Sequence, residues 1–166
     1  MENVSINKSI HLSEHITLGE VTKSRHTEIY NIPSHVAIEN LKRVCSWLEE
    51  LRKRYNLRYV LRSVSPPKLG EEDTPIIITS GYRSAQLNRK VGGSPTSNHL
   101  TGCAVDIRVY GIEQAMRYAV ILMDYADETK QDYDEILIER NHYGAIWLHF
   151  AVRPKDNRRK TMFLQK

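Results

Sequence analysis

Two strand-like runs near the end of the chain constrain the fold more than any other feature. Residues 135–139 and 145–152 are rich in β-branched, aromatic and other apolar side chains, a composition that favours strands. The segment Asn141-His142-Tyr143-Gly144 between them is typical of a hairpin turn. The pattern therefore predicts two neighbouring antiparallel strands.

Helical patterns are mixed with these strands. Residues 35–55 carry apolar side chains at helical spacing, and Ser34 is placed to cap the first turn of that helix. The other expected elements are a buried strand over 76–79, a short helix over 85–91, a strand over 103–109 and a helix over 111–126. Strands and helices follow no regular βαβ order, so the predicted class is α+β.

The length of 166 residues suits one domain. We expect that domain over residues 1–152, with a polar N-terminal extension of about 1–31 and a basic C-terminal tail over 153–166. Residues 62–75 contain three of the six prolines and predict a loop within the domain. The formal net charge of +4 suits an anionic polymer as partner without choosing among nucleic acid, cell wall and membrane surface.

The remaining compositional signals argue against several classes of protein. Cys45 and Cys103 form no CxxC pair, so they predict neither a disulfide framework nor a structural zinc cluster. No apolar run reaches the length of a transmembrane helix, and the N-terminus lacks the apolar core of a secretory signal. We therefore expect synthesis in the cytoplasm without a signal peptide. The sequence leaves the oligomeric state open, and a monomer is the favoured state.

Two of the seven histidines lie where they can meet a carboxylate. His99 follows a Gly/Ser-rich loop, Asp106 comes seven residues later on an expected strand, and His149 lies in an otherwise apolar strand. Imidazole and carboxylate are ligands that zinc accepts, and catalytic zinc sites use three protein ligands. Spacing alone also fits surface residues or a hydrogen-bonded core histidine, so it leaves this site open.

Three ordered motifs add to that pattern. They are Ser80-Gly81-Tyr82-Arg83-Ser84, then Ser97-Asn98-His99-Leu100-Thr101-Gly102-Cys103-Ala104-Val105-Asp106, and finally Trp147-Leu148-His149. Together they closely resemble the M15-type zinc D-alanyl-D-alanine carboxypeptidases, including the phage-like branch of that family. The resemblance covers roughly residues 11–152.

The resemblance implies a hedgehog/D,D-peptidase-like fold, with a central antiparallel sheet and flanking helices. It also implies a zinc metallopeptidase acting on peptidoglycan stem peptides. His99, Asp106 and His149 match the family's zinc ligands, and Arg83 matches an arginine that faces the substrate carbonyl. A guanidinium there stabilises negative charge that develops in the transition state. A structural ion pair is the alternative role for Arg83.

The proton acceptor is less clear from the resemblance. Several branches of the family place an acid three residues before the last ligand or a histidine two before it, and those positions are Ile146 and Trp147 here. Glu139 resembles the acidic residue on the preceding strand of the phage-like branch, and Asp134 is the second candidate. Glu139 shares a face with His149 only if the hairpin loop has an odd number of residues.

Two other functions compete with the peptidase. The departure at Ile146 favours a non-catalytic zinc-containing module of the same fold, which would bind cell wall or serve as a phage structural part. Nucleic-acid binding through the basic tail lacks interleaved aromatic residues beyond Phe163, so we expect none. The expected site of action is the cell wall or periplasm, and the sequence leaves both the export route and the choice between carboxypeptidase and endopeptidase open.

Overall fold

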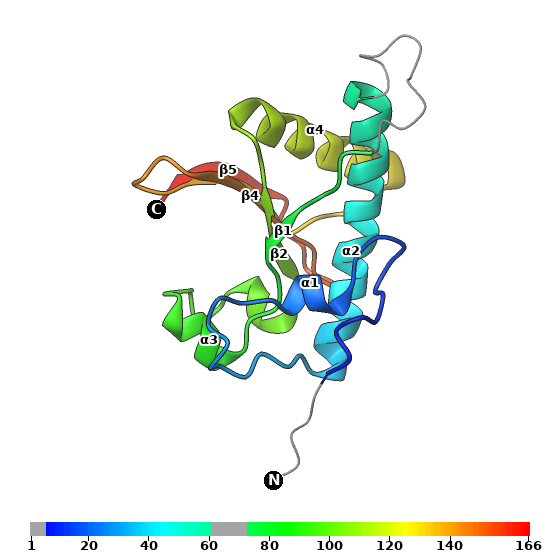
Figure 1. Ribbon diagram of the computed structural model, residues 1–166. Coiled ribbons are helices and arrows are strands. Elements are labelled where there is room, and N and C mark those ends of the chain that lie inside the picture. The colour runs from blue at the N-terminus through cyan, green and yellow to red at the C-terminus, as the bar shows by residue number, and fades with distance from the viewer. Residues whose placement is uncertain (1–5, 61–72) are drawn as a thin grey trace.

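A five-stranded mixed sheet forms the centre of the computed structural model, which describes residues 6–60 and 73–166 (Figure 1). The strand order is β1-β2-β4-β3-β5. The strands are β1 (Ile78–Ser80), β2 (Ala104–Arg108), β3 (Glu135–Arg140), β4 (Ile146–Ala151) and β5 (Lys160–Gln165). The predicted α+β class is confirmed, whereas most of the loop expected over 62–75 lies outside the described residues.

The helices expected over 35–55, 85–91 and 111–126 are confirmed within a few residues. The helical elements are α1 (Leu18–Thr22), α2 (His35–Tyr55), the π-helical turn Asn56–Val60, α3 (Ala85–Lys90), the 3₁₀ turn Asn98–Thr101 and α4 (Ile112–Thr129). Ser34 caps α2 by accepting a hydrogen bond from the Ala37 amide. Within the described ranges, no helix has the length and apolarity that a membrane crossing requires.

The two faces of the sheet have different surroundings. Alternate residues of the central strands form an apolar face that packs against α2 and α4: Val105, Ile107, Ile136, Ile138, Leu148 and Phe150. The Trp47 ring of α2 lies 5.4 Å from the Phe150 ring and extends that core. Because side chains alternate along a strand, Asp106 and His149 lie on the opposite face, which α2 and α4 leave open (Figure 1).

The register of the β3–β4 hairpin decides whether Glu139 and His149 lie on the same face of the sheet. Its loop comprises the five residues 141–145, and Glu139 pairs with Trp147 while Leu137 pairs with His149. Residues paired directly across a ladder share a face. Glu139 and His149 therefore lie on the same, open face of the sheet.

The C-terminal segment corrects one expectation. Residues 160–165 form β5 instead of a tail, and β5 pairs in parallel with β3, which adds a parallel edge strand to the otherwise antiparallel sheet. The fully buried Asp134 carboxylate holds this segment in place, because it accepts hydrogen bonds from Arg158 and forms an ion pair with Arg153. The basic composition of residues 153–166 thus neutralises acidic groups of the sheet.

Residues 16–22 of the N-terminal segment also contribute to the core. Ile16, Leu18 and Val21 are buried, and Thr17 begins α1 with a capping box that includes Glu20. This segment packs beside β1. The expectation of a polar extension up to residue 31 is therefore wrong for this part of the chain.

Replacement of Asp134 by Asn should destabilise the fold. Burial acts to raise the pKa of Asp134, but hydrogen bonds from Arg158 and Asn98 outweigh it and hold the pKa at about 2. The folded-state pKa is lower than the unfolded value, so this carboxylate stabilises the protein above pH ~4 and loses that effect as the pH falls towards 2. We expect Asp134→Asn to lower the free energy of unfolding at pH 7 by about 2–3 kcal/mol.

Denaturant unfolding of both proteins between pH 7 and pH 2 measures this effect. The difference between them should shrink as the pH falls below 4. Asp132→Asn is the matched control, because Asp132 pairs with Arg159 at the surface and should contribute under about 1 kcal/mol. A constant difference across the whole pH range would show that the charge of Asp134 does not carry the effect.

Candidate metal centre

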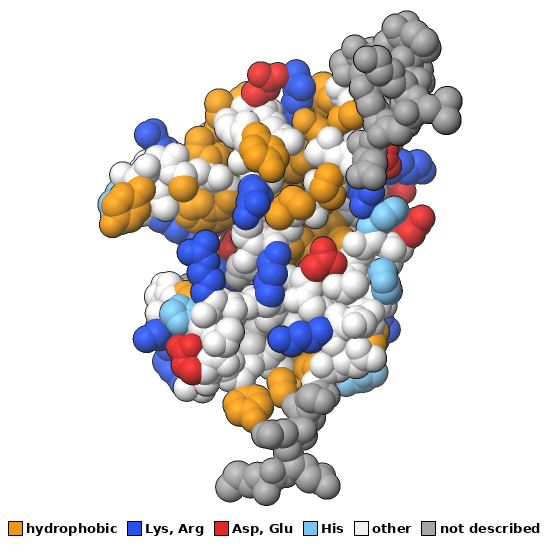
Figure 2. All heavy atoms as spheres, viewed as in Figure 1, with side chains coloured by type: hydrophobic (Ala, Val, Ile, Leu, Met, Phe, Trp, Pro, Cys, Tyr) orange, Lys and Arg blue, Asp and Glu red, His pale blue; other side chains and the backbone are white. Residues whose placement is uncertain are grey.

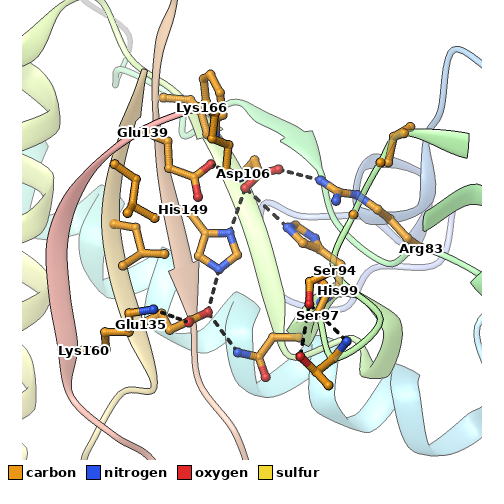
Figure 3. A pocket seen from close by; sticks show the side chains of 18 of the residues that line it. Arg83, Ser94, Ser97, His99, Asp106, Glu135, Glu139, His149, Lys160 and Lys166 are labelled. Carbon is orange, nitrogen blue, oxygen red and sulfur yellow. Dashed lines mark hydrogen bonds and ion pairs between the residues drawn. The ribbon is translucent and has the colours of Figure 1, made fainter. Parts of the chain in front are cut away.

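His99, Asp106 and His149 meet on the open face of the sheet (Figure 3). One ligand atom from each lies within 4.8 Å of the others. The carboxylate oxygen Oδ1 of Asp106 is 2.9 Å from Nδ1 of His149 and 3.4 Å from Nε2 of His99. Direct pairing of Asp106 with His149 between β2 and β4 produces this geometry, and His99 comes from the 3₁₀ turn before β2. The three residues predicted as ligands are therefore brought together.

Burial and mutual contact control the protonation of these groups. Burial lowers the pKa of His99, which leaves a neutral imidazole of the kind a metal requires. Burial acts to raise the pKa of Asp106, but His99 and His149 lower it well below its usual range. Burial acts to lower the pKa of His149, but its hydrogen bonds with Asp106 and Glu135 outweigh burial and raise the pKa to about 9. A cation bound here must displace a proton from His149.

The segment that carries Gly81 positions the His99 ring. The Gly81 carbonyl accepts a hydrogen bond from Nδ1 of His99 at 2.7 Å, and the Arg83 amide donates to the His99 carbonyl. The neighbouring Tyr82 amide donates to the Val21 carbonyl. A Cβ atom at residue 81 would lie 2.3 Å from the Val21 carbonyl oxygen, so only glycine allows this approach. Nε2 of His99 is thereby left to face Asp106.

His149 has a second partner that the sequence did not reveal. Its Nε2 atom lies 3.1 Å from Oε2 of Glu135, at the start of β3. Glu135 and His149 both lie on the open face, which the strand alternation of β3 and β4 could have indicated once their register was known. Nothing in the local sequence singles out Glu135 from the other acidic residues.

Arg83 lies beside the ligand group and makes the structural ion pair that was its alternative role. Its Nη2 donates to Oδ2 of Asp106 at 2.8 Å, and its Nε donates to the Ser80 hydroxyl. Arg83 also lines the pocket above the three ligands. A guanidinium has five N–H groups, so these two contacts leave donors that a bound molecule can use.

Of the two candidate proton acceptors, only Glu139 lines the pocket. Its carboxylate accepts a hydrogen bond from Nζ of Lys166 at 2.7 Å, and that ammonium group also lies over the Trp147 ring. Asp134, by contrast, is 0% exposed, and both its oxygens are engaged in the ion pairs described above. The geometry of the pocket thus favours Glu139 over Asp134.

The pocket over the ligand group has a volume of about 620 Å³. Cationic side chains line it alongside the acidic ones: Arg83, Arg158, Lys160 and Lys166. Arg158 lies between β4 and β5, Lys160 begins β5, and Lys166 follows it. Figure 2 shows Lys and Arg side chains gathered in the hollow between the projecting strands and the lobe that carries α3.

Comparison with protein families agrees with this geometry. Residues 68–134 match the family model described as Peptidase M15. This segment is an M15 peptidase domain. The match includes His99 and Asp106 and ends before His149, which the sheet brings to them. A comparison with curated proteins finds no match.

The donor set fits the metal site typical of M15 zinc peptidases. The outer ring nitrogens of His99 and His149 are held by Gly81 and Glu135, so their inner nitrogens both face Asp106. Two imidazole nitrogens and one carboxylate form a three-ligand set, which in catalytic zinc sites leaves one position open. The pocket provides space beside that position.

His149→Ala should abolish tight zinc binding. The wild-type chain should bind one zinc ion and gain thermal stability from it, because a ligand that binds only the folded state stabilises that state. Loss of a residue that only hydrogen-bonds to a metal ligand typically lowers metal affinity about 10–100-fold. Loss of the ligand itself should lower zinc affinity by more than that. Zinc titration against a competing chelator, together with a thermal melt, measures both effects.

His142→Ala is the matched control, because His142 is exposed at the hairpin turn. It should leave zinc affinity unchanged. Equal zinc affinity of the wild type and His149→Ala would rule out His149 as a ligand.

Proposed function

We propose that this chain is a zinc-dependent peptidase that hydrolyses peptide bonds in peptidoglycan stem peptides. The observation that supports it best is the His99–Asp106–His149 group on the floor of a pocket that also contains Arg83 and Glu139. The M15 match supports the peptidase class. The site of action we propose is the cell wall or periplasm, where that substrate lies.

His99, Asp106 and His149 would hold the zinc ion, which when bound would supply Lewis-acid chemistry for a peptide carbonyl and an attacking water. The chain must then accept a proton from the attacking water and deliver it to the leaving amine. Glu139 fits this role, since it lies on the face of His149 and lines the pocket. Its contact with Lys166 keeps a cation beside the carboxylate.

Arg83 fits the role of binding the oxygen on which negative charge develops. It is held by Ser80 and Asp106, so its orientation is fixed before substrate arrives. Donors that are oriented in advance need no reorganisation during the reaction and stabilise the transition state most effectively. The same contact with Asp106 couples Arg83 to the ligand group.

The charge of the pocket supports an anionic peptide as substrate. Four cations line it against three carboxylates, those of Asp106, Glu135 and Glu139, and a bound zinc ion would add two positive charges. Stem peptides of peptidoglycan carry free carboxylates that such a field attracts. Lys160 and Lys166 are about half exposed, so they remain accessible to a ligand.

A non-catalytic zinc module that binds the same peptides is the second candidate. Ile146 and Trp147 occupy the positions where other branches of the family place an acid or a histidine. The 2.7 Å contact with Lys166 also engages one of the two oxygens of the Glu139 carboxylate. Binding without cleavage is the behaviour that separates this candidate from the peptidase.

Mass spectrometry of purified muropeptides incubated with the protein tests the proposal. New fragments should form, disappear with a chelator and return when zinc is restored. The fragment masses distinguish loss of a terminal residue from cleavage within a cross-link. Retention of muropeptides without any fragment, by protein that carries one zinc, would support the binding module instead.

Glu139→Gln should bind zinc as the wild type does and lose activity by about 10²–10⁴-fold, the usual contribution of a general base. The amide has the shape of the carboxylate but cannot accept the proton. Zinc content and the rate of muropeptide cleavage are measured on the same preparation. Cleavage at the wild-type rate would show that Glu139 is not the proton acceptor.

Arg83→Gln should lower kcat by about 10²–10³-fold at saturating zinc, as the loss of an oxyanion donor does. Arg89→Gln is the matched control, because Arg89 is exposed on α3 and does not line the pocket. Steady-state kinetics with saturating zinc separates the loss of transition-state stabilisation from weaker metal binding. An unchanged kcat would leave Arg83 with a structural role alone.

A further inference from the structure

The two ring nitrogens of His149 contact different carboxylates. Nδ1 lies 2.9 Å from Asp106, inside the ligand group, and Nε2 lies 3.1 Å from Glu135, outside it (Figure 3). The two nitrogens are on opposite edges of the imidazole ring, so one ion cannot be shared by Nδ1 and Glu135. Glu135 is therefore placed as a partner of the histidine and not as a fourth ligand.

Four neighbours hold the Glu135 carboxylate, whose side chain is only 13% exposed. Oε2 accepts a hydrogen bond from Nδ2 of Asn98 at 3.1 Å as well as facing His149. Oε1 accepts one from Arg158 at 3.0 Å and lies 3.8 Å from Nζ of Lys160. With donors on both oxygens, the carboxylate cannot turn away from Nε2 without losing several contacts.

The other histidine of the group is held differently. Nδ1 of His99 donates to the backbone carbonyl of Gly81. That acceptor carries no charge, and no substitution removes it. Only His149 has a charged side-chain acceptor on its outer nitrogen, so only there can the effect of such an acceptor be tested by mutation.

We propose that Glu135 is a positioning residue that fixes the tautomer and the ring orientation of His149 for zinc. By accepting the Nε2 proton, Glu135 leaves Nδ1 as the nitrogen that faces Asp106. Its negative charge also makes the imidazole a stronger ligand, as carboxylates behind metal-bound histidines do. The proposal rests on the zinc site of the proposed function, but it concerns metal binding and not the cleavage step.

Glu135→Ala and Glu135→Gln, made in the full chain, test this role. Zinc affinity, measured by competition with a chelator, should fall about 10–100-fold in the alanine variant. The glutamine variant should fall less, because its amide oxygen still accepts from Nε2 while the charge is lost. The absorption spectrum of the Co²⁺-loaded protein should shift in the alanine variant and be largely restored in the glutamine variant, which a purely structural role would not produce.

Glu139→Gln is the matched control, because it removes a charge from the same face of the same strand without touching Nε2. It should leave zinc affinity within about twofold of the wild type, whereas outer partners of a ligand contribute 10–100-fold. Wild-type affinity and an unshifted Co²⁺ spectrum in Glu135→Ala would overturn the proposal, and so would an equal loss of affinity in Glu139→Gln. Peptide cleavage that survives removal of zinc would instead overturn the proposed function.

Discussion

The site depends on the buried carboxylate of Asp106. An ionised carboxylate in the middle of a sheet costs several kcal/mol unless it is paired. Here one oxygen faces His149 and His99 and the other accepts from Arg83. Each partner comes from a different element, so the contacts of this one carboxylate link β2 to β4, to the turn before β2 and to the loop after β1. Strand pairing brings these distant residues together, and their contacts neutralise the buried charge.

Those partners are in turn held by parts of the chain that carry no chemistry. The Asn31 side chain donates to the carbonyls of Thr22 and Tyr82 and accepts from the Ser84 amide, which joins the N-terminal segment to the loop that carries Arg83. Gly81 lies so close to the backbone of Val21 that no side chain fits between them. The N-terminal segment thus contributes to the site by fixing the backbone on which Arg83 and the acceptor of His99 lie.

The sequence predicted the helices and the grouping of His99, Asp106 and His149 better than the contacts around that group. Apolar spacing located α2 and α4, and the ordered motifs pointed to the three residues through a family resemblance. Strand alternation predicts that Glu139 and His149 share a face only for a hairpin loop with an odd number of residues. The structure supplies that loop length. The role of Asp134 depends on Arg158, whose side chain reaches it after a turn of the chain, and no local pattern encodes such a contact. The same holds for Glu135.

The basic C-terminal segment shows why composition alone misled. The Lys and Arg side chains after residue 152 predict a basic tail, yet three of them face acidic groups that strand alternation gathers on one side of the sheet. Glu135 pairs with Arg158 and Lys160, and Glu139 pairs with Lys166. Without these cations the two carboxylates would share a pocket with Asp106 and have less compensation, and like charges at short range repel strongly in a partly buried site. The last strand therefore completes the electrostatics of the site as well as the sheet, and the partly exposed Lys160 and Lys166 place positive charge at the pocket.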